Sequence, residues 1–221
     1  MNTREVAGGR TIHVPAVDPD DLRPAGPDAL TDEFDLDSVL IDGGDASGSA
    51  GDGTLSTALL RQVNLAGAKL GPVTLADTVL SGVDLSNASL QRITARRTEL
   101  RTCRGIGLRL SIEQATDLAV TDCRLDYATL HIERVKGVAV FAGCSFRETT
   151  ISGNLSDVLF QDCDFTETEF RATRATRCDL RTSRFTSARG LLSLRGAMIS
   201  PDQTVAIAAL IAAEAGLIVS G

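Results

Sequence analysis

Five cysteines are the side chains of this sequence with the clearest capacity for chemistry. Cys103, Cys123, Cys144 and Cys163 follow one another at intervals of 20, 21 and 19 residues, and Cys178 lies fifteen residues further on. Four thiolates can hold a zinc ion if their sulfur atoms converge at about 2.3 Å from one point. Unmodified cysteine is also a small hydrophobic side chain that packs well in a core. Whether the sulfur atoms converge on one point depends on the fold that produces this spacing.

Two glutamates, Glu113 and Glu133, form a second pair at an interval of 20 residues. Each stands where neighbouring segments carry a small side chain, and two interpretations follow. If both are buried, they form an acid pair with raised pKa values. If the chain bulges locally, both carboxylates reach solvent or an arginine.

Sequence motifs of catalysis are missing. The chain has two histidines, His13 and His131, and it contains no G-x-S-x-G, no phosphate-binding G-x-x-x-x-G-K-S/T and no H-E-x-x-H. We therefore expect no enzyme activity, no cofactor and no catalytic or structural metal.

A period of five residues runs through most of the chain. Every fifth residue from Leu55 to Leu90 is leucine, and the pattern continues, mostly with leucine or phenylalanine, as far as Gly190. Five residues fit neither the 3.6-residue turn of a helix nor the alternation of a straight strand. The pattern is satisfied if about three residues are extended and two turn a corner, so the chain should coil around its own core. The residues expected in this core stack include Leu125, Phe146, Phe165, Phe185, Cys103, Cys123, Cys144 and Cys163.

The cysteine spacing supplies the second period. An interval near 20 predicts four corners per coil, a square cross-section and about seven coils between Leu55 and Gly190. The phase shifts near residues 135–141 and 151–160 indicate one insertion and one deletion at corners. Stacked coils pair like parallel strands about 4.8 Å apart. Thiols in such a line do not converge on a metal, so the pattern favours core packing and a reducing compartment.

The repeat resembles the pentapeptide-repeat family, whose motif is A(D/N)LXX. The copies at residues 83–85, 88–90, 163–165 and 178–180 read Val-Asp-Leu, Ala-Ser-Leu, Cys-Asp-Phe and Cys-Asp-Leu. The resemblance implies a right-handed quadrilateral parallel β-helix with a C-terminal capping helix. It also implies, from some members, a head-to-head homodimer and a rod that mimics DNA in the DNA-binding saddle of DNA gyrase.

The two ends of the chain differ from the repeats. We expect residues 1–35 to be an acidic, flexible tail and residues 36–54 to form an irregular cap followed by a Gly/Ser/Asp loop. The β-helix should then span residues 55–199. Residues 200–221 should form a helix, introduced by a capping box at Ser200 with Pro201 at its first position, and an apolar tail.

The C-terminal helix is apolar around most of its circumference. A helix that caps a rod buries only one side, so the remainder predicts a homodimer interface. The residues expected there are Val205, Ile207, Ala208, Leu210, Ile211, Leu217, Ile218 and Val219.

Charge is divided unevenly along the chain, whose formal net charge is −7. Residues 1–55 hold twelve acidic and three basic residues, a net charge of −9, and the remainder has a net charge of +2. At steps of 20 residues, one outward position predicts a ladder of ion pairs formed by Asp77, Arg97, Asp117, Asp157 and Arg177. An acidic tail folded back over arginines of the rod is a further hypothesis.

These patterns predict a cytoplasmic, non-enzymatic, rod-shaped scaffold that binds an unidentified protein. The alternative is a DNA mimic that modulates DNA gyrase and protects it against fluoroquinolones, but the residues beyond residue 55 have a net charge of +2 rather than a surplus of acids. The acidic composition argues against direct nucleic-acid binding. No stretch of 18 consecutive apolar residues occurs, so we expect no membrane association.

Overall fold

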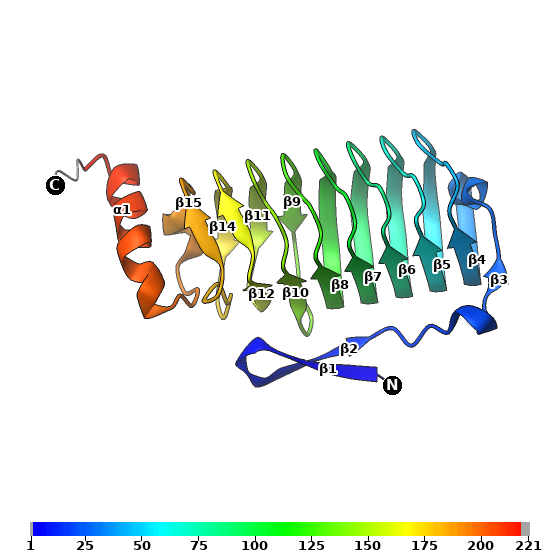
Figure 1. Ribbon diagram of the computed structural model, residues 1–221, viewed down its shortest axis with the longest axis horizontal. Coiled ribbons are helices and arrows are strands. Elements are labelled where there is room, and N and C mark those ends of the chain that lie inside the picture. The colour runs from blue at the N-terminus through cyan, green and yellow to red at the C-terminus, as the bar shows by residue number, and fades with distance from the viewer. Residues whose placement is uncertain (1, 218–221) are drawn as a thin grey trace.

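The computed structural model describes residues 2–217 of the chain. It is a parallel β-solenoid of about eight turns with a C-terminal helix, α1 (Thr204–Glu214). Figure 1 shows the coils stacked along the long axis of the molecule, with α1 across one end and an N-terminal hairpin along one side. The predicted fold class, a parallel β-helix closed by a helix, is confirmed.

The solenoid is built from long strands in its first half and short strands in its second half. They are β3 (Arg23–Pro24), β4 (Asp32–Asp42), β5 (Ala50–Arg61), β6 (Lys69–Ser81), β7 (Ser89–Arg101), β8 (Arg109–Thr121), β9 (Thr129–Ile132), β10 (Ala139–Ala142), β11 (Thr150–Asn154), β12 (Val158–Gln161), β13 (Asp164–Thr166), β14 (Glu169–Arg174) and β15 (Arg184–Thr186). The hairpin consists of β1 (Asn2–Val6) and β2 (Arg10–Val14). Short 3-10 segments are η1 (Ala7–Gly9), η2 (Pro19–Asp21), η3 (Pro27–Leu30), η4 (Leu191–Leu194) and η5 (Pro201–Gln203).

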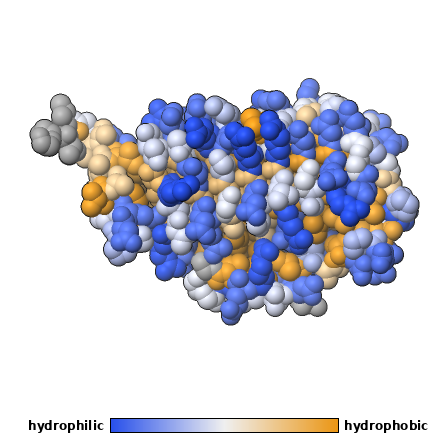
Figure 2. All heavy atoms as spheres, viewed as in Figure 1, coloured by the Kyte–Doolittle hydropathy of each residue, from blue (hydrophilic) through white to orange (hydrophobic). Residues whose placement is uncertain are grey.

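Strand register repeats in steps of about twenty residues. Leu60 pairs with Leu80, and Leu80 pairs with Leu100, all in parallel. Equivalent residues of successive coils therefore lie directly over one another, and the large apolar side chains fill the axis. Figure 2 shows a surface on which hydrophilic residues predominate, with hydrophobic residues at the α1 end and also along the lower side of the rod.

Phenylalanines fill the axis in the second half of the rod. The Phe146 and Phe165 rings are fully buried and stack with their centroids 5.5 Å apart. Phe185 follows at 5.3 Å from Phe165 but is only partly buried, because it lies in the last coil. Such aromatic pairs contribute about 0.5–1.5 kcal/mol beyond the area that they bury.

Two irregular coils interrupt the twenty-residue step. Ala115 pairs with Val135, twenty residues on, whereas Leu118 pairs with Ala139, twenty-one residues on. The inserted residue thus lies between residues 135 and 139. The following step from Ala139 to Val158 is only nineteen residues, which restores the original phase.

Corner residues adopt the left-handed conformation. One column of corners contains Asp77, Arg97, Asp117, Asp157 and Arg177, with φ between +46° and +64°. Asp, Asn and Gly tolerate this conformation best. The residues expected to form the ion-pair ladder are thus a column of corners.

The N-terminal third departs from the predictions. Residues 1–35 were expected to form a flexible tail, but the described part contains the β1–β2 hairpin, three 3-10 segments and the start of β4. The irregular cap and loop at 36–54 is instead a regular coil, in which Leu36 pairs with Leu55 and Leu40 with Leu59. The five-residue beat continues through it, but Ala46 and Gly51 stand at the Leu positions and hide it. This additional coil accounts for eight turns rather than seven.

The C-terminal helix forms where its capping residues place it. The Ser200 side chain and the side chain of Gln203 complete a capping box, and the Ser200 amide donates to Gln203 Oε1 at 2.7 Å. The helix ends before Gly216, whose φ is +76°. Within residues 2–217, no helix combines the length and the apolar composition needed to cross a membrane.

Candidate protein-interaction surfaces

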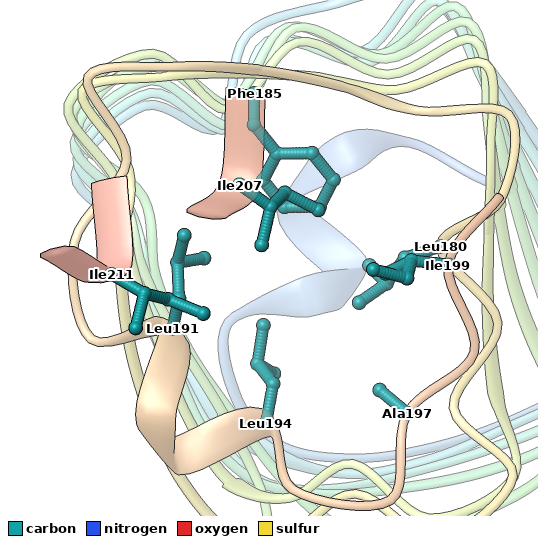
Figure 3. Close-up of a pocket in the computed structure, with 8 residues that line it drawn as sticks. All are labelled: Leu180, Phe185, Leu191, Leu194, Ala197, Ile199, Ile207 and Ile211. Carbon is teal, nitrogen blue, oxygen red and sulfur yellow. The ribbon is translucent and has the colours of Figure 1, made fainter. Parts of the chain in front are cut away.

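One side of α1 closes the end of the rod. Ile207 is buried and Ile211 is half-buried, and both point into a pocket of about 150 Å³ between the helix and the last coil (Figure 3). The lining is entirely apolar and consists of Leu180, Phe185, Leu191, Leu194, Ala197, Ile199, Ile207 and Ile211. These contacts assign Ile207 and Ile211 to the rod rather than to an external partner.

The opposite side of α1 is open. Val205 is 81% exposed and Ala208 is exposed, whereas Leu210 is half-buried and packs against the core of the rod with Ile211. Leu217, just beyond the helix, is 64% exposed. The remaining residues expected in the interface, Ile218 and Val219, lie outside the described residues.

The helix at this end of the rod carries a single charged residue. That residue is Glu214, and its carboxylate accepts a hydrogen bond from the Leu191 amide at 3.1 Å. Five large hydrophobic side chains are exposed in the described part of the chain, and all except Tyr127 belong to this end. Contiguous exposed apolar surface of this kind marks an interaction site.

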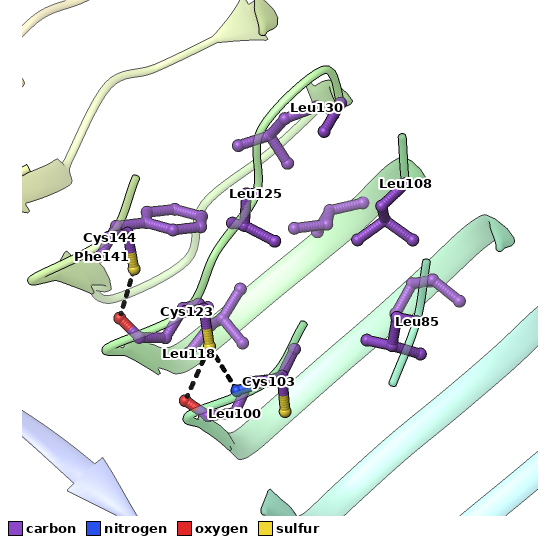
Figure 4. Packing of buried hydrophobic residues seen from close by; sticks show 14 of the residues in the cluster. Leu85, Leu100, Cys103, Leu108, Leu118, Cys123, Leu125, Leu130, Phe141 and Cys144 are labelled. Carbon is purple, nitrogen blue, oxygen red and sulfur yellow. Dashed lines mark hydrogen bonds between the residues drawn. The ribbon is translucent and has the colours of Figure 1, made fainter. Parts of the chain in front are cut away.

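The cysteines form a line, not a cluster. The amide of Cys103 donates to the sulfur of Cys123 at 3.3 Å, and the thiols of Cys123 and Cys144 donate to backbone carbonyl groups of the preceding coil (Figure 4). Ser183 continues the line, since its hydroxyl accepts from the Cys163 amide at 3.1 Å. Cys178 belongs to a different inward column, the one that contains Ala139 and Val158.

Burial determines the chemistry of these thiols. All five cysteines are free and buried. Burial raises the pKa of the Cys178 thiol to about 12. A hydrogen bond with Cys123, reinforced by burial, also raises the pKa of Cys103. At neutral pH the Cys103 and Cys178 thiols are therefore protonated. Among residues 2–217, no three His, Cys, Asp or Glu side chains converge as metal ligands.

The two glutamates that stand at inward positions of the repeat do not point inward. Glu113 and Glu133 are exposed, while Ile112 and Ile132 are buried beside them. The register shifts between β7 and β8 so that Ile93 pairs with Ile112. This local bulge turns the carboxylate outward, so the alternative of a buried acid pair is wrong.

The corner ladder is completed by the N-terminal hairpin. Arg97 pairs with Asp77, and Arg177 donates to Asp157 at 2.6 and 2.7 Å. Asp117 does not pair with Arg97; it lies 2.9 Å from Nδ1 of His13 in β2. Arg10 of β2 similarly lies 3.4 Å from Asp157. Each partly exposed pair contributes about 0–1 kcal/mol.

An apolar strip lies beneath the hairpin. Ala119, Val140 and Leu159 point outward from β8, β10 and β12, and each is at most 2% exposed because the hairpin covers them. Ile12 of β2 is completely buried on this strip, and Val138, from the inserted coil, joins the same cluster. Burying one such side chain stabilises the docked hairpin by roughly 1.5–3 kcal/mol.

A buried carboxylate anchors the other strand of the hairpin. Glu99 is 1% exposed, and its oxygens accept hydrogen bonds from Arg4 of β1 at 3.0 Å and from Arg101 at 2.5 Å. Burial disfavours the charged form of Glu99, but the hydrogen bonds and charges of Arg101 and Arg4 outweigh it. The pKa of Glu99 is therefore below its ordinary value.

The hairpin corrects the hypothesis of an acidic tail over arginines. The N-terminal segment does fold back, but it docks through Arg4, Arg10 and His13 onto acids of the rod. The sequence held a signal for this face. One outward column is mostly apolar at steps of about twenty residues, and its members are Leu40, Leu59, Val79, Glu99, Ala119, Val140, Leu159 and Asp179.

Coils of about twenty residues with five-residue sides define a class of solenoid, and sequence comparison identifies the repeat. The family model described as pentapeptide repeats matches eight copies in residues 58–101 and 154–189. These segments of the chain are pentapeptide repeats, as the motif predicted. No curated protein matches the sequence.

Solved structures of low similarity include pentapeptide-repeat proteins. A trypsin-treated form of QnrB1, described as a plasmid-mediated fluoroquinolone resistance protein, has 19% identity and a TM-score of 0.38, with 90% of this chain and 96% of that chain covered. Full-length QnrB1 has 16% identity and a TM-score of 0.34, with 86% and 94% covered. HetL, a pentapeptide-repeat protein involved in heterocyst differentiation regulation from the cyanobacterium Nostoc sp. strain PCC 7120, has 18% identity and a TM-score of 0.29, with 75% and 86% covered. At these scores the similarities assign no function to this chain.

Proposed function

We propose that this chain is a non-enzymatic, rod-shaped scaffold that binds other proteins and works as a homodimer joined through α1. The observation that carries the proposal is the apolar surface at the α1 end. Val205, Leu217, Leu192 and Ile199 are between 40% and 81% exposed, and the one charged side chain of α1 is bound to the rod. A two-fold dimer brings this patch against its own copy and removes it from water.

The helix geometry supports a paired arrangement. At about 100° per residue, Val205, Ala208, Ala209 and Ala212 fall on the side opposite Ile207 and Ile211. The alanines would let a second helix approach closely, and Val205 would be the largest side chain in the contact. Dimerisation would therefore leave the α1 contacts with the rod intact.

A DNA mimic that acts on DNA gyrase is the alternative, and the distribution of charge gives it less support. Six of the acidic residues, from Asp32 to Asp45, lie on the first coil of the solenoid. In a dimer joined through α1, that coil would be at each outer end. The central coils, where a phosphate mimic needs its acids, carry arginine and aspartate together.

A reducing, cytoplasmic location fits the same proposal. Five unpaired thiols are buried in the described structure. Disulfides are rare in reducing compartments, where such thiols persist.

Light scattering combined with size-exclusion chromatography tests the dimer. The wild-type chain should elute with twice the monomer mass of 23.3 kDa. The double variant V205K/L217K should elute at the monomer mass with an unchanged melting temperature, because both side chains are exposed in the monomer. Y127K is the matched control, since Tyr127 is 54% exposed but lies far from α1, and it should remain dimeric. A monomeric wild-type chain at about 100 µM would exclude this interface.

A further inference from the structure

The face beneath the β1–β2 hairpin has the composition of a binding surface. Ala119, Val140 and Leu159 form an outward row across three paired strands, and they pack in a cluster separate from the core of the rod. The outward row on another side of the coils is polar, with Asn64, Asp84 and Arg104 among its members. The apolar row beneath the hairpin thus differs in character from that polar row.

Carboxylates border the apolar row. Asp117 and Asp157 stand at corners along one edge, and Glu99 continues the row toward the first coils. A ligand for this face needs an aliphatic side chain for the row and positive charges for the three carboxylates. The surface thus defines the chemistry of its ligand.

The hairpin meets that requirement as a separate body. Ile12 is fully buried on the row, and Arg10 and His13, on the same strand, reach Asp157 and Asp117. β1 and β2 pair only with each other, so within the described chain they form a sheet of their own. In the described structure, side chains of the hairpin make its contacts with the strands that it crosses. Within residues 2–217, the only backbone groups of the rod among their hydrogen-bond partners are the carbonyls of Asp157 and Arg177, which accept from Arg10.

The attachment has the form of a tethered ligand. The hairpin runs along the rod from Glu99, which Arg4 contacts, to the coil of Asp179, whose carboxylate would lie 4.0 Å from a Cβ added at Gly8 in the turn (Figure 1). Most side chains of β1 are exposed. Two-stranded hairpins of this size are marginally stable alone. A competing segment needs only to displace these side-chain contacts.

We propose that the face formed by Glu99, Asp117, Ala119, Val140, Asp157 and Leu159 is a docking site for protein segments that present one aliphatic side chain between basic ones. Residues 2–14 occupy this site in cis, and the partner of the scaffold is a segment of the same chemistry. The inference rests on the proposed scaffold function, but it does not depend on the α1 dimer.

A labelled peptide of residues 2–14 is the probe. It should bind the full-length variant I12D, whose own hairpin is displaced by the buried charge, at least tenfold more tightly than it binds the wild-type chain. The matched control is T11D, because Thr11 is exposed next to Ile12, and this variant should bind the peptide as weakly as the wild type. A peptide that itself carries I12D should not bind.

Variants of the rod locate the site. In the I12D background, D117R/D157R should weaken peptide binding at least tenfold, and arginine is acceptable at these corners because Arg97 and Arg177 occupy the same column. E148R, a charge reversal at a corner of another column, should leave binding unchanged. If I12D does not fold, R4E/R10E releases the hairpin by a different route and takes its place.

Two results would overturn the proposal. One is a folded I12D chain with a released hairpin that does not bind the peptide, which would make the hairpin a structural strap over the irregular coils. The other is equal peptide binding by I12D, T11D and the wild type. The molar mass of I12D is measured in the same samples, so a failure of peptide binding is distinguishable from a failure to dimerise.

Discussion

The guanidinium group of Arg4 lies 3.0 Å from the buried carboxylate of Glu99, ninety-five residues further along the chain. This contact ties the first strand of the protein to the fourth coil of its rod. It also reverses the simplest expectation from composition, because a strongly acidic N-terminal region docks through its few bases. The folded hairpin thus brings the few basic residues of this acidic region into contact with specific carboxylates of the rod.

The Glu99 contact predicts sensitivity of the hairpin to acid. Arg101 and Arg4 lower the pKa of Glu99 from its ordinary value of 4.5 despite burial. A carboxylate with a depressed pKa in the folded state stabilises that state above the unfolded value, and the contribution is lost as pH falls through the folded value. NMR amide signals of residues 2–14 should thus become those of a released hairpin as the pH falls below about 4.

The variant Glu99→Gln provides the control for that titration. It removes the charge but keeps the shape, and it should weaken docking at neutral pH by roughly 1–3 kcal/mol, the usual contribution of hydrogen bonds to a charged group. Release of the hairpin in this variant should then depend little on pH between 3 and 7. An unchanged acid transition would show that other carboxylates control docking.

The phenylalanine stack predicts a graded loss of stability. Phe165→Ala removes a ring that is fully buried and contacts Phe146, Phe160 and Phe185, so it should cost about 3–5 kcal/mol. Phe185→Ala should cost less, because that ring is only partly buried. Melting temperatures followed by circular dichroism measure both, and equal losses would contradict the assigned positions.

The line of cysteines predicts thiols that do not react in the folded protein. All five are buried, and burial raises the pKa of Cys178 to about 12. A thiol-specific reagent at pH 8 should therefore modify none of them in the native state and all five after denaturation. Rapid modification of any thiol in the native protein would contradict this prediction, because a reagent reaches a buried thiol only if the coils open.

A glycine in β5 predicts intolerance of any side chain. Gly53 has φ +146°, and a Cβ there would lie 1.8 Å from the carbonyl oxygen of Phe34 in the preceding strand. Gly53→Ala should lower the melting temperature by several degrees. Gly43→Asn is the matched control, because a Cβ at Gly43 meets nothing within 4 Å and its φ of +74° suits asparagine. Similar losses in both variants would show that conformation, not the close approach, limits this coil.

The repeat itself could be predicted because each five-residue unit repeats the same local requirement. Leu55 to Leu90 mark the axis, and the cysteine interval fixes four sides per coil, so the fold follows from periodicity and the geometry of parallel strands. The first coil escaped prediction because Ala46 and Gly51 replace leucine there. A sequence repeat that is recognised by its large side chains cannot be recognised where small side chains replace them.

Sequence alone thus determined the solenoid, its buried thiols and its C-terminal helix, because neighbouring residues and regular spacings encode them. Tertiary structure decided where the N-terminal strands lie, which carboxylates they neutralise and which side of α1 faces the rod. Those outcomes depend on contacts such as Ile12 with Leu159 and Ile207 with the last coil. Residues separated by more than a hundred positions carry no shared period, so only the folded chain brings their charges and apolar surfaces together.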